Sequence, residues 1–359
     1  MPDSAGDSRQ AAPATPPLAW SLSQDDWATL ASELGQPSFR VRQIWEWLYR
    51  RGAASFAEMA NLPLALRSAL ADRVQLAPWL QVASMEDPES GTRKLLLECR
   101  DGERIECVVI PSADSSTLCV STQAGCAFGC AFCATGNCGF RRDLDAGEIV
   151  GQFFAASKVS PSPLTHIVFM GMGEPFANYG NTLRAVRIFN SGDGLSIGAR
   201  KITISTCGVV PGIRKLAEEG LQVELAVSLH APDDALRSSI MPVNRRWPIG
   251  ELIPACCDFN ARTKRIVTFE YTLVDGVNDS DACAGRLARL LSPSFARVNL
   301  IPLSPVAHYE GRRPSPARCR AFAQILESCG LNVTLRHSKG SSVAAACGQL
   351  RLGNQGPTA

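Results

Sequence analysis

The sequence predicts an α/β protein in which strands alternate with helices. From about residue 117 onward, short apolar and β-branched segments alternate with longer segments of helical pattern, and this alternation is typical of βα units. The strand segments are mostly apolar, as in a parallel sheet that helices cover. A parallel barrel and a doubly wound sheet both fit. No G-x-G-x-x-G motif follows the first strand, so a dinucleotide-binding unit is unsupported.

The chain before this domain is predicted to be a tail followed by a small helical domain. Residues 1–19 are expected to be disordered, because their prolines leave little for a helix to build on. Residues 20–80 are predicted to be helical. Ser23 has the position of an N-cap, a second helix with a one-faced apolar stripe begins after Ser38, and residues 55–73 hold the remaining helical pattern.

Residues 81–112 are predicted to form a β-hairpin linker. Two segments rich in strand-forming residues, 91–99 and 105–110, flank Asp101-Gly102, which is a strong hairpin signal. We therefore expect this hairpin to connect the helical domain to the main domain.

The main domain is predicted to cover residues 113–352, with a short tail at 353–359. Chemistry in parallel βα barrels lies at the carboxyl ends of the strands, so residues that follow a strand are the first site candidates. The predicted helices are 146–157, 182–189, 212–219, 249–262, 283–291 and 316–329. The predicted strands are 117–121, 166–170, 201–205, 224–228, 266–273 and 297–301, with a late strand at 332–336.

The composition limits the possible classes of protein. The chain has 359 residues, of which 45% are hydrophobic, enough for one large domain with a small partner. Its formal net charge of +2 means that a nucleic-acid surface must come from local clustering. No signal peptide or membrane-spanning run is evident, so a cytoplasmic location is expected. There, 14 cysteines favour metal binding or catalysis over a disulfide framework.

Three cysteines, Cys126, Cys130 and Cys133, have C-x3-C-x2-C spacing in one short loop. Thiolates this close can face a common centre and suit an iron–sulfur cluster or zinc. A cubane cluster normally takes four cysteines, so three leave one iron open for a small molecule. The alternatives are three unrelated thiols or a zinc site without its fourth ligand; zinc would require a second C-x2-C or H-x3-H pair, and none is evident.

This spacing, with Phe132 just before the last cysteine, resembles the signature of the radical SAM enzymes. The resemblance implies a 4Fe-4S cluster on the three cysteines. It also implies that the amino and carboxylate groups of S-adenosylmethionine (SAM) chelate the open iron. The fold that it implies is a partial (β/α)6 barrel, which fits the six predicted strands.

Residues at three strand ends are candidates for binding SAM. After the second strand, Gly173 allows close backbone approach, and Glu174 offers a carboxylate for an ammonium group. A Gly-Glu-Pro turn alone is a weak signal, but in this superfamily the resemblance assigns it to the SAM amino group. Hydroxyl groups and an imidazole for a ribose or carboxylate follow the next two strands, at Ser205 and at Ser228, Leu229 and His230.

A combination of motifs narrows the resemblance to the RlmN/Cfr family over residues 22–352. These are radical SAM methyltransferases that act on an adenosine of large-subunit ribosomal RNA. Segment 139–142 is closer to the RlmN branch, which methylates carbon 2, than to the Cfr branch, which methylates carbon 8. The motifs are 39–44, 91–94, 119–126, 133–136, 139–142, 170–175, 228–232, 299–302 and 345–350.

The resemblance assigns roles to three further residues. Cys347 is the methyl carrier, Cys119 is the thiol that releases the product through a disulfide with Cys347, and Glu106 is the base. Two molecules of SAM are used per turnover. From residue type alone, the two cysteines would be buried small residues and Glu106 an exposed charge.

Three positions depart from the family pattern. Ser304 stands where the family usually has an asparagine thought to contact SAM, so Ser304 is predicted to line the SAM site. Cys207 replaces a common serine, and residues 340–344 replace an acidic run. These departures leave open the affinity for SAM and the RNA target, including a paralogue that acts on another RNA.

The expected partners are ribosomal RNA, transfer RNA as a further substrate, and a low-potential electron donor such as flavodoxin or ferredoxin. We expect a monomer. Two other functions remain as alternatives: a radical SAM enzyme with a protein or small-molecule substrate, and an iron–sulfur or zinc protein that transfers electrons or binds RNA. The arginines predicted to bind RNA, with an ordinary solvated face as the alternative, are Arg40, Arg42, Arg50, Arg51, Arg141 and Arg142.

Overall fold

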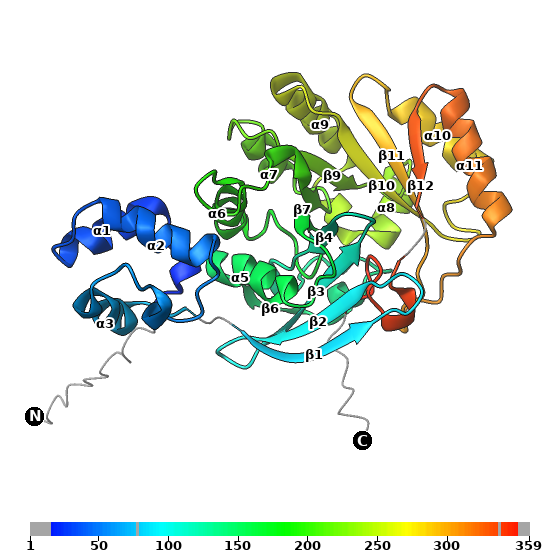
Figure 1. The fold of residues 1–359 in the computed structure, drawn as a ribbon. Coiled ribbons are helices and arrows are strands. Elements are labelled where there is room, and N and C mark those ends of the chain that lie inside the picture. The colour runs from blue at the N-terminus through cyan, green and yellow to red at the C-terminus, as the bar shows by residue number, and fades with distance from the viewer. Residues whose placement is uncertain (1–15, 77–78, 337–338, 351–359) are drawn as a thin grey trace, which may run out of the picture.

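The computed structural model describes residues 16–76, 79–336 and 339–350. A helical N-terminal region lies beside a larger α/β domain, as Figure 1 shows. Most of the predicted N-terminal tail and the whole tail at 353–359 lie outside the described residues. Leu18 and Ala19, which the sequence placed in the tail, are instead buried in the core.

The N-terminal region has the predicted helical character. Its first helix begins as expected, because the Ser23 hydroxyl accepts a hydrogen bond from the Asp26 amide in a capping box. Trp20 stacks on Phe154 of the main domain with ring centroids 4.5 Å apart, so the two parts share an apolar contact. The elements are η1 (Ala19–Ser21), α1 (Gln24–Glu33), α2 (Phe39–Tyr49), η2 (Phe56–Glu58) and α3 (Leu64–Arg73).

The main domain is built on one ten-stranded sheet with the order β1-β2-β3-β4-β7-β8-β9-β10-β11-β12. From β4 onward all neighbouring strands are parallel. The sheet curves as a partial barrel with helices on its outer side (Figure 1). The predicted strands, including the late one, are confirmed as β4 (Ser116–Cys119), β7 (Leu164–Phe169), β8 (Ile202–Thr206), β9 (Glu224–Ser228), β10 (Val267–Leu273), β11 (Ala296–Pro302) and β12 (Asn332–Leu335).

The segment predicted as a hairpin linker has a different place in the fold. It forms three antiparallel strands, β1 (Leu80–Glu86), β2 (Arg93–Glu98) and β3 (Arg104–Pro111). β3 pairs with β4, with Val108 opposite Cys119. The segment therefore extends the main sheet rather than bridging two domains.

The helices follow the strands as the alternation predicted. The sequence missed α8, which follows β9, and a small sheet of β5 (Gln123–Gly125) and β6 (Phe140–Asp143), because both are too short to show a period. No helix among the described residues is long and apolar enough to cross a membrane. The helices are α4 (Ala134–Asn137), α5 (Ala146–Ser157), α6 (Tyr179–Asn190), α7 (Val210–Leu216), α8 (Asp234–Ile240), α9 (Ile249–Thr263), α10 (Asp281–Leu290) and α11 (Pro316–Ser328).

Candidate active site

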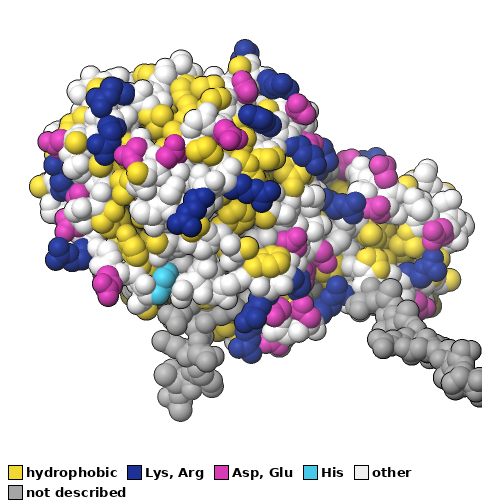
Figure 2. Space-filling model, turned by 180° about the vertical axis from the view of Figure 1, so that it is seen from behind, with side chains coloured by type: hydrophobic (Ala, Val, Ile, Leu, Met, Phe, Trp, Pro, Cys, Tyr) yellow, Lys and Arg dark blue, Asp and Glu magenta, His cyan; other side chains and the backbone are white. Residues whose placement is uncertain are grey.

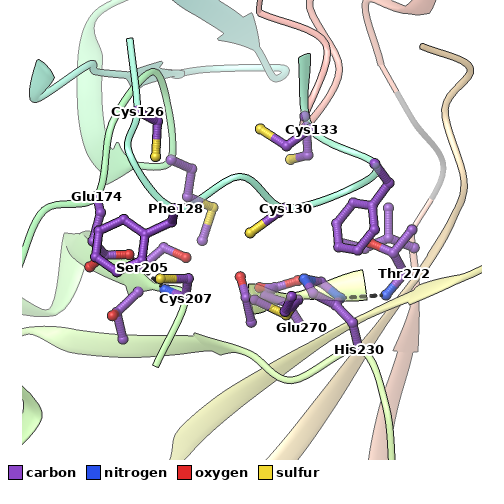
Figure 3. Close-up of a pocket in the computed structure, with 18 of the residues that line it drawn as sticks. Cys126, Phe128, Cys130, Cys133, Glu174, Ser205, Cys207, His230, Glu270 and Thr272 are labelled. Atoms are coloured by element: carbon purple, nitrogen blue, oxygen red, sulfur yellow. Dashed lines mark hydrogen bonds between the residues drawn. The ribbon is translucent and has the colours of Figure 1, made fainter. Parts of the chain in front are cut away.

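The three cysteines of the C-x3-C-x2-C motif lie on a loop between β5 and α4, which we call the cysteine loop (residues 126–133). Two backbone hydrogen bonds hold it, from Cys126 to the Gly139 carbonyl at 3.0 Å and from Ala131 to the Ile240 carbonyl at 2.9 Å. All three cysteines line one cavity with the carboxyl ends of the parallel strands. Figure 3 shows them around one space. We call this space the cluster-side cavity.

The thiols fit an iron–sulfur cluster better than a single metal ion. Burial raises the pKa of Cys126 to about 12, so the free thiol keeps its proton, and metal binding would release it. Among the described residues, no three His, Cys, Asp or Glu side chains are arranged to hold one metal ion. A cluster binds each thiolate through a different iron, so it requires thiols around a wider space, as the cysteine loop provides.

Glu174 lies at the base of this cavity and is fixed from two sides. Its carboxylate accepts hydrogen bonds from the Phe176 amide at 3.0 Å and the Cys207 amide at 2.7 Å, which ties the ends of β7 and β8 together. Burial raises the pKa of Glu174 despite these hydrogen bonds. A Cβ at Gly173 would lie 2.6 Å from the Gln123 side chain, so only glycine fits there.

The predicted SAM-binding residues at the other strand ends divide into two groups. Ser205, Ser228, His230 and Ser304 line the cluster-side cavity. Leu229 is fully buried among apolar residues and does not line it, so only its backbone is near the site.

His230 is held as a neutral imidazole. Its Nδ1 accepts a hydrogen bond from the Thr272 amide at 2.8 Å, so the ring hydrogen resides on Nε2. Burial, with a smaller contribution from Arg237, lowers the pKa of His230 to about 3. The imidazole is therefore a hydrogen-bond donor at neutral pH rather than a cation.

Cys119 and Cys347, far apart in the sequence, line the same second cavity inside the barrel. This space of about 690 Å³ is bordered by inward-facing side chains of the parallel strands, and we call it the lumen cavity. Burial raises the pKa of Cys119 to about 12, and the nearby Cys347 thiol adds to the effect. Both cysteines are free thiols. The expected disulfide is thus absent from this structure, although the two thiols share one cavity.

Residues 339–350, which we call the Cys347 segment, fold back over the barrel. The sequence suggested a flexible segment there, and the structure shows definite anchors. Asp87, in the turn between β1 and β2, accepts hydrogen bonds from the Gly340 amide and the Ser342 hydroxyl, both at 2.9 Å. At the other end, the Ala134 amide donates to the Gly348 carbonyl at 2.7 Å. The methyl-carrier candidate is therefore tied both to the extended sheet and to the start of α4, directly after the cysteine loop.

Glu106, the predicted base, lies on β3 and is buried rather than exposed. Its carboxylate is 3.1 Å from Lys94 Nζ, which also donates to the Ala344 carbonyl at 3.4 Å. Glu106 and Val108 point to the same face of β3, and Val108 is opposite Cys119. Glu106 does not line either cavity, so the structure brings it to the neighbourhood of Cys119 without placing it in the shared space.

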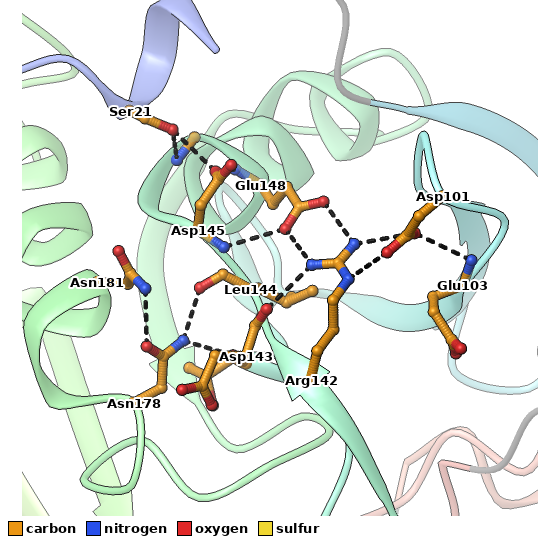
Figure 4. Close-up of polar contacts among 12 residues, drawn as sticks. Ser21, Asp101, Glu103, Arg142, Asp143, Leu144, Asp145, Glu148, Asn178 and Asn181 are labelled. Carbon is orange, nitrogen blue, oxygen red and sulfur yellow. Dashed lines mark hydrogen bonds and ion pairs between the residues drawn. The ribbon is translucent and has the colours of Figure 1, made fainter. Parts of the chain in front are cut away.

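The six arginines predicted to bind RNA differ in their surroundings. The prediction that Arg142 binds RNA is corrected, because the Arg142 guanidinium is shared between Asp101 and Glu148, as Figure 4 shows. Arg51 pairs with Glu46 at 2.9 Å, and Arg50 donates to the Gly192 carbonyl at 3.0 Å. Arg40 donates to Gln43 at 2.7 Å.

The other two arginines, Arg42 and Arg141, are exposed and form no ion pair with another described residue. They are therefore the best remaining candidates for RNA contacts. On the face shown in Figure 2, basic side chains are interspersed with acidic and apolar ones, in keeping with the low net charge.

Three residues at or near the site were missed. Arg237 is fully buried and donates to the Cys207, Ser228 and Leu229 carbonyls. Asp87 anchors the Cys347 segment, and Glu270 lines both cavities. Only Glu270 had a sequence signal, because a carboxylate within an otherwise apolar strand of a covered sheet requires an explanation.

Comparisons with known proteins agree with this geometry. Residues 120–284 match the radical SAM superfamily, and residues 20–76 match the ribosomal RNA large subunit methyltransferase N-terminal domain. The probable dual-specificity RNA methyltransferase RlmN of Symbiobacterium thermophilum is 45% identical, with 92% of this chain and 90% of that protein covered. The dual-specificity RNA methyltransferase RlmN of Anaeromyxobacter dehalogenans is also 45% identical, with 94% and 92% covered.

A solved structure is similar over nearly the whole chain. The crystal structure of a radical SAM methyltransferase from Sphaerobacter thermophilus superimposes with a TM-score of 0.90 at 49% identity, covering 94% of this chain and 99% of that one. This similarity confirms the partial barrel with an N-terminal helical region.

Proposed function

Because the chain belongs to the RlmN family of radical SAM methyltransferases, we propose that it methylates carbon 2 of an adenosine in 23S ribosomal RNA. Transfer RNA is the proposed second substrate, which the words "dual-specificity" in the relatives' names support. The observation that carries the proposal is the presence of Cys119 and Cys347 in one cavity beside the cysteine loop. A radical SAM enzyme with another substrate class would have no need for this pair.

The proposed chemistry uses sulfur because carbon 2 of adenine has no lone pair with which to attack a methyl group. The Cys347 thiol first loses its proton and attacks the methyl carbon of one SAM. The new S–CH3 bond makes Cys347 a thioether, and the sulfonium–CH3 bond breaks to release S-adenosylhomocysteine. A 4Fe-4S cluster on Cys126, Cys130 and Cys133, when bound, supplies the one-electron chemistry that turns a second SAM into a hydrogen-abstracting radical.

Once the Cys347 methyl carbon is joined to the base, two bonds must break. Glu106, whose ionised form the Lys94 ion pair stabilises, removes the ring proton. At this stage the radical adduct also gives up its unpaired electron to a one-electron acceptor, which leaves a closed-shell thioether between Cys347 and the base. Cys119 loses its proton and attacks the Cys347 sulfur. An S–S bond forms, the S–C bond breaks, and its electron pair goes to the product carbon, which takes up a proton. The disulfide then needs a two-electron reductant before the next turnover.

The remaining parts of the proposal concern partners. The N-terminal helical region and the exposed Arg42 and Arg141 contact the RNA, because exposed cations that form no ion pair with a described residue suit phosphate binding. A low-potential donor such as flavodoxin or ferredoxin supplies the electron, and the enzyme acts as a monomer.

The proposal is tested by nucleoside mass spectrometry of RNA from a deletion strain carrying the gene or its variants. We expect 2-methyladenosine to disappear on deletion and to return with the unaltered protein but not with Cys347→Ala. Cys119→Ala should accumulate an RNase-sensitive covalent protein–RNA species, because the base is attacked but not released. Loss of 8-methyladenosine instead would assign carbon 8, and unchanged RNA would refute an RNA substrate.

A further inference from the structure

Glu270 occupies the junction of the two cavities and has no role in the chemistry above. It lies in the middle of β10, is 5% exposed, and lines both cavities together with Cys347. Its Oε1 accepts a hydrogen bond from Asn299 Nδ2 at 3.0 Å, which fixes the plane of the carboxyl group. Its Oε2 is buried and has no partner among the described residues.

A buried oxygen without a hydrogen-bond partner is unfavourable unless a ligand completes it. The nearby titratable and charged groups come from several elements. Arg297 on β11 and Arg336 after β12 favour the ionised carboxylate, Cys347 is a thiol, and His230 is a neutral imidazole. Burial has the largest effect and raises the pKa of Glu270. The surroundings thus favour the neutral acid more than is usual for a glutamate.

The hydrogen bond from Asn299 also determines where the acid proton resides. In the neutral acid, Oε1 accepts from the Asn299 amide, so the hydrogen is on Oε2, the atom without a partner among the described residues. The group therefore presents a fixed donor toward the space beside Cys347. Adenine ring nitrogens that carry no hydrogen are acceptors that such a donor can reach.

The position favours the substrate base over SAM as the occupant. Cys119 and Asn299 line only the lumen cavity, whereas the cysteine loop lines only the cluster-side cavity. A base that receives carbon from Cys347 and is released by Cys119 must lie where both thiols reach, which is the lumen cavity. Asn299, which orients Glu270, belongs to that cavity.

We propose that Glu270 is a further substrate-binding residue, which holds the adenine by donating a hydrogen bond from Oε2 to a ring nitrogen. This rests on the proposed function, because it takes the substrate to be an adenosine in RNA. The contact orients the base toward Cys347 without placing a negative charge beside the reacting sulfur.

The test compares Glu270→Gln, Glu270→Ala and a control. Glutamine keeps an oxygen for Asn299 and places an NH2 donor where Oε2 lies, whereas alanine removes both. Glu251→Ala is the control, because it removes the carboxylate of an exposed glutamate on α9 that lines neither cavity. Each variant is measured for its affinity for an adenosine-containing RNA oligonucleotide and for the same oligonucleotide with an abasic site. Mass spectrometry measures Cys347 methylation, and circular dichroism checks folding.

We expect the unaltered protein, Glu270→Gln and Glu251→Ala to prefer the adenosine oligonucleotide. In Glu270→Ala the ratio of the two affinities should be about tenfold smaller, as expected for the loss of one hydrogen bond to a buried group, while Cys347 remains methylated. The proposal is overturned if Glu270→Gln is as impaired as Glu270→Ala, or if neither variant differs from the unaltered protein. It is also overturned if only the methylation of Cys347 is lost, which would indicate a SAM contact. If the unaltered protein has no preference for adenosine, the proposed function itself fails.

Discussion

The cluster-side cavity and the lumen cavity share Cys347 and Glu270 but are built in different ways. The first is formed mainly by short motifs, the cysteine loop and the strand ends, whose residues are close in sequence. The second is formed by single residues on successive strands and by the Cys347 segment, which returns from the end of the chain. A motif of neighbouring residues is visible in a sequence, whereas single residues that meet across a barrel are not.

Removal of the cysteine loop thiols should have the largest effect and should separate the two cavities. Replacing Cys126, Cys130 and Cys133 with alanine is expected to abolish the brown colour, the roughly four irons per chain of one cubane, and methyl transfer to RNA. The lumen cavity should survive, so mild oxidation should still join Cys119 to Cys347, as seen by mass spectrometry of peptides. A colourless unaltered protein that carries one zinc per chain would contradict the cluster.

A smaller effect is expected where the Cys347 segment is anchored. Asp87→Ala removes the acceptor for the Gly340 amide and the Ser342 hydroxyl, so the segment should hold Cys347 less accurately. A misplaced reacting group commonly slows a reaction about 10- to 100-fold. Both the oxidation of Cys119 with Cys347 and RNA methylation should slow, while iron content stays unchanged.

Glu89→Ala is the matched control for Asp87→Ala. Glu89 is in the same turn and carries the same charge, and its exposed side chain makes no hydrogen bond to a described residue. If both variants slow the reaction equally, charge rather than anchoring is responsible.

Replacing each of the two neighbouring arginines of β6 should have a different effect, on stability for Arg142 and on RNA binding for Arg141. Arg142→Ala leaves the nearly buried Glu148 without its cation, which should lower the free energy of unfolding by about 1–3 kcal/mol. Arg141→Ala should leave stability unchanged but weaken RNA binding and reduce its dependence on salt, because Arg141 is exposed beside the exposed Phe140. Thermal melts and RNA titrations at several salt concentrations measure both. Equal losses of stability would show that Arg141 is also structural.

The effect expected at His230 is absent at neutral pH and appears only in acid. The pKa of His230 is about 3 in the folded protein, compared with 6.5 for the unperturbed group. As the pH falls below 6.5, the unfolded chain gains a proton that the folded chain does not bind. His230 should therefore lower the free energy of unfolding by up to about 1.4 kcal/mol per pH unit in this window.

His230→Asn is the variant to compare, because asparagine tolerates the positive φ of 56° and offers an oxygen to the Thr272 amide. The measurement is denaturant unfolding of metal-free protein between pH 4 and pH 7, roughly the range of the histidine transition. As the pH falls, the free energy of unfolding should decrease less steeply for the variant than for the unaltered protein. Parallel curves for the two proteins would mean that the imidazole is not held neutral.

The order of strands and helices, the cysteine loop and most of the strand-end residues could be predicted from the sequence alone. These follow from local periods and short motifs, which depend on neighbours in the chain. Resemblance to a family brought Cys119, Cys347 and Glu106 into view, and the structure confirms that the two thiols share a cavity. Glu106 shows the limit of this approach, because its ion pair with Lys94 was not visible in the sequence.

The roles of single polar residues depend on the tertiary structure. Arg142 and Arg141 are adjacent, yet Arg142 is held between the carboxylates of Asp101 and Glu148, which lie on two different parts of the fold, and Arg141 remains exposed. Asp87 and Ser342 meet because β1 and β2 extend the main sheet and the chain end folds back onto them. Glu270 has an oxygen aimed into a shared cavity because Asn299 on the next strand holds the other oxygen. In each case a partner lies on another element of the fold, and a hydrogen bond or ion pair depends on distance in space rather than on position in the sequence.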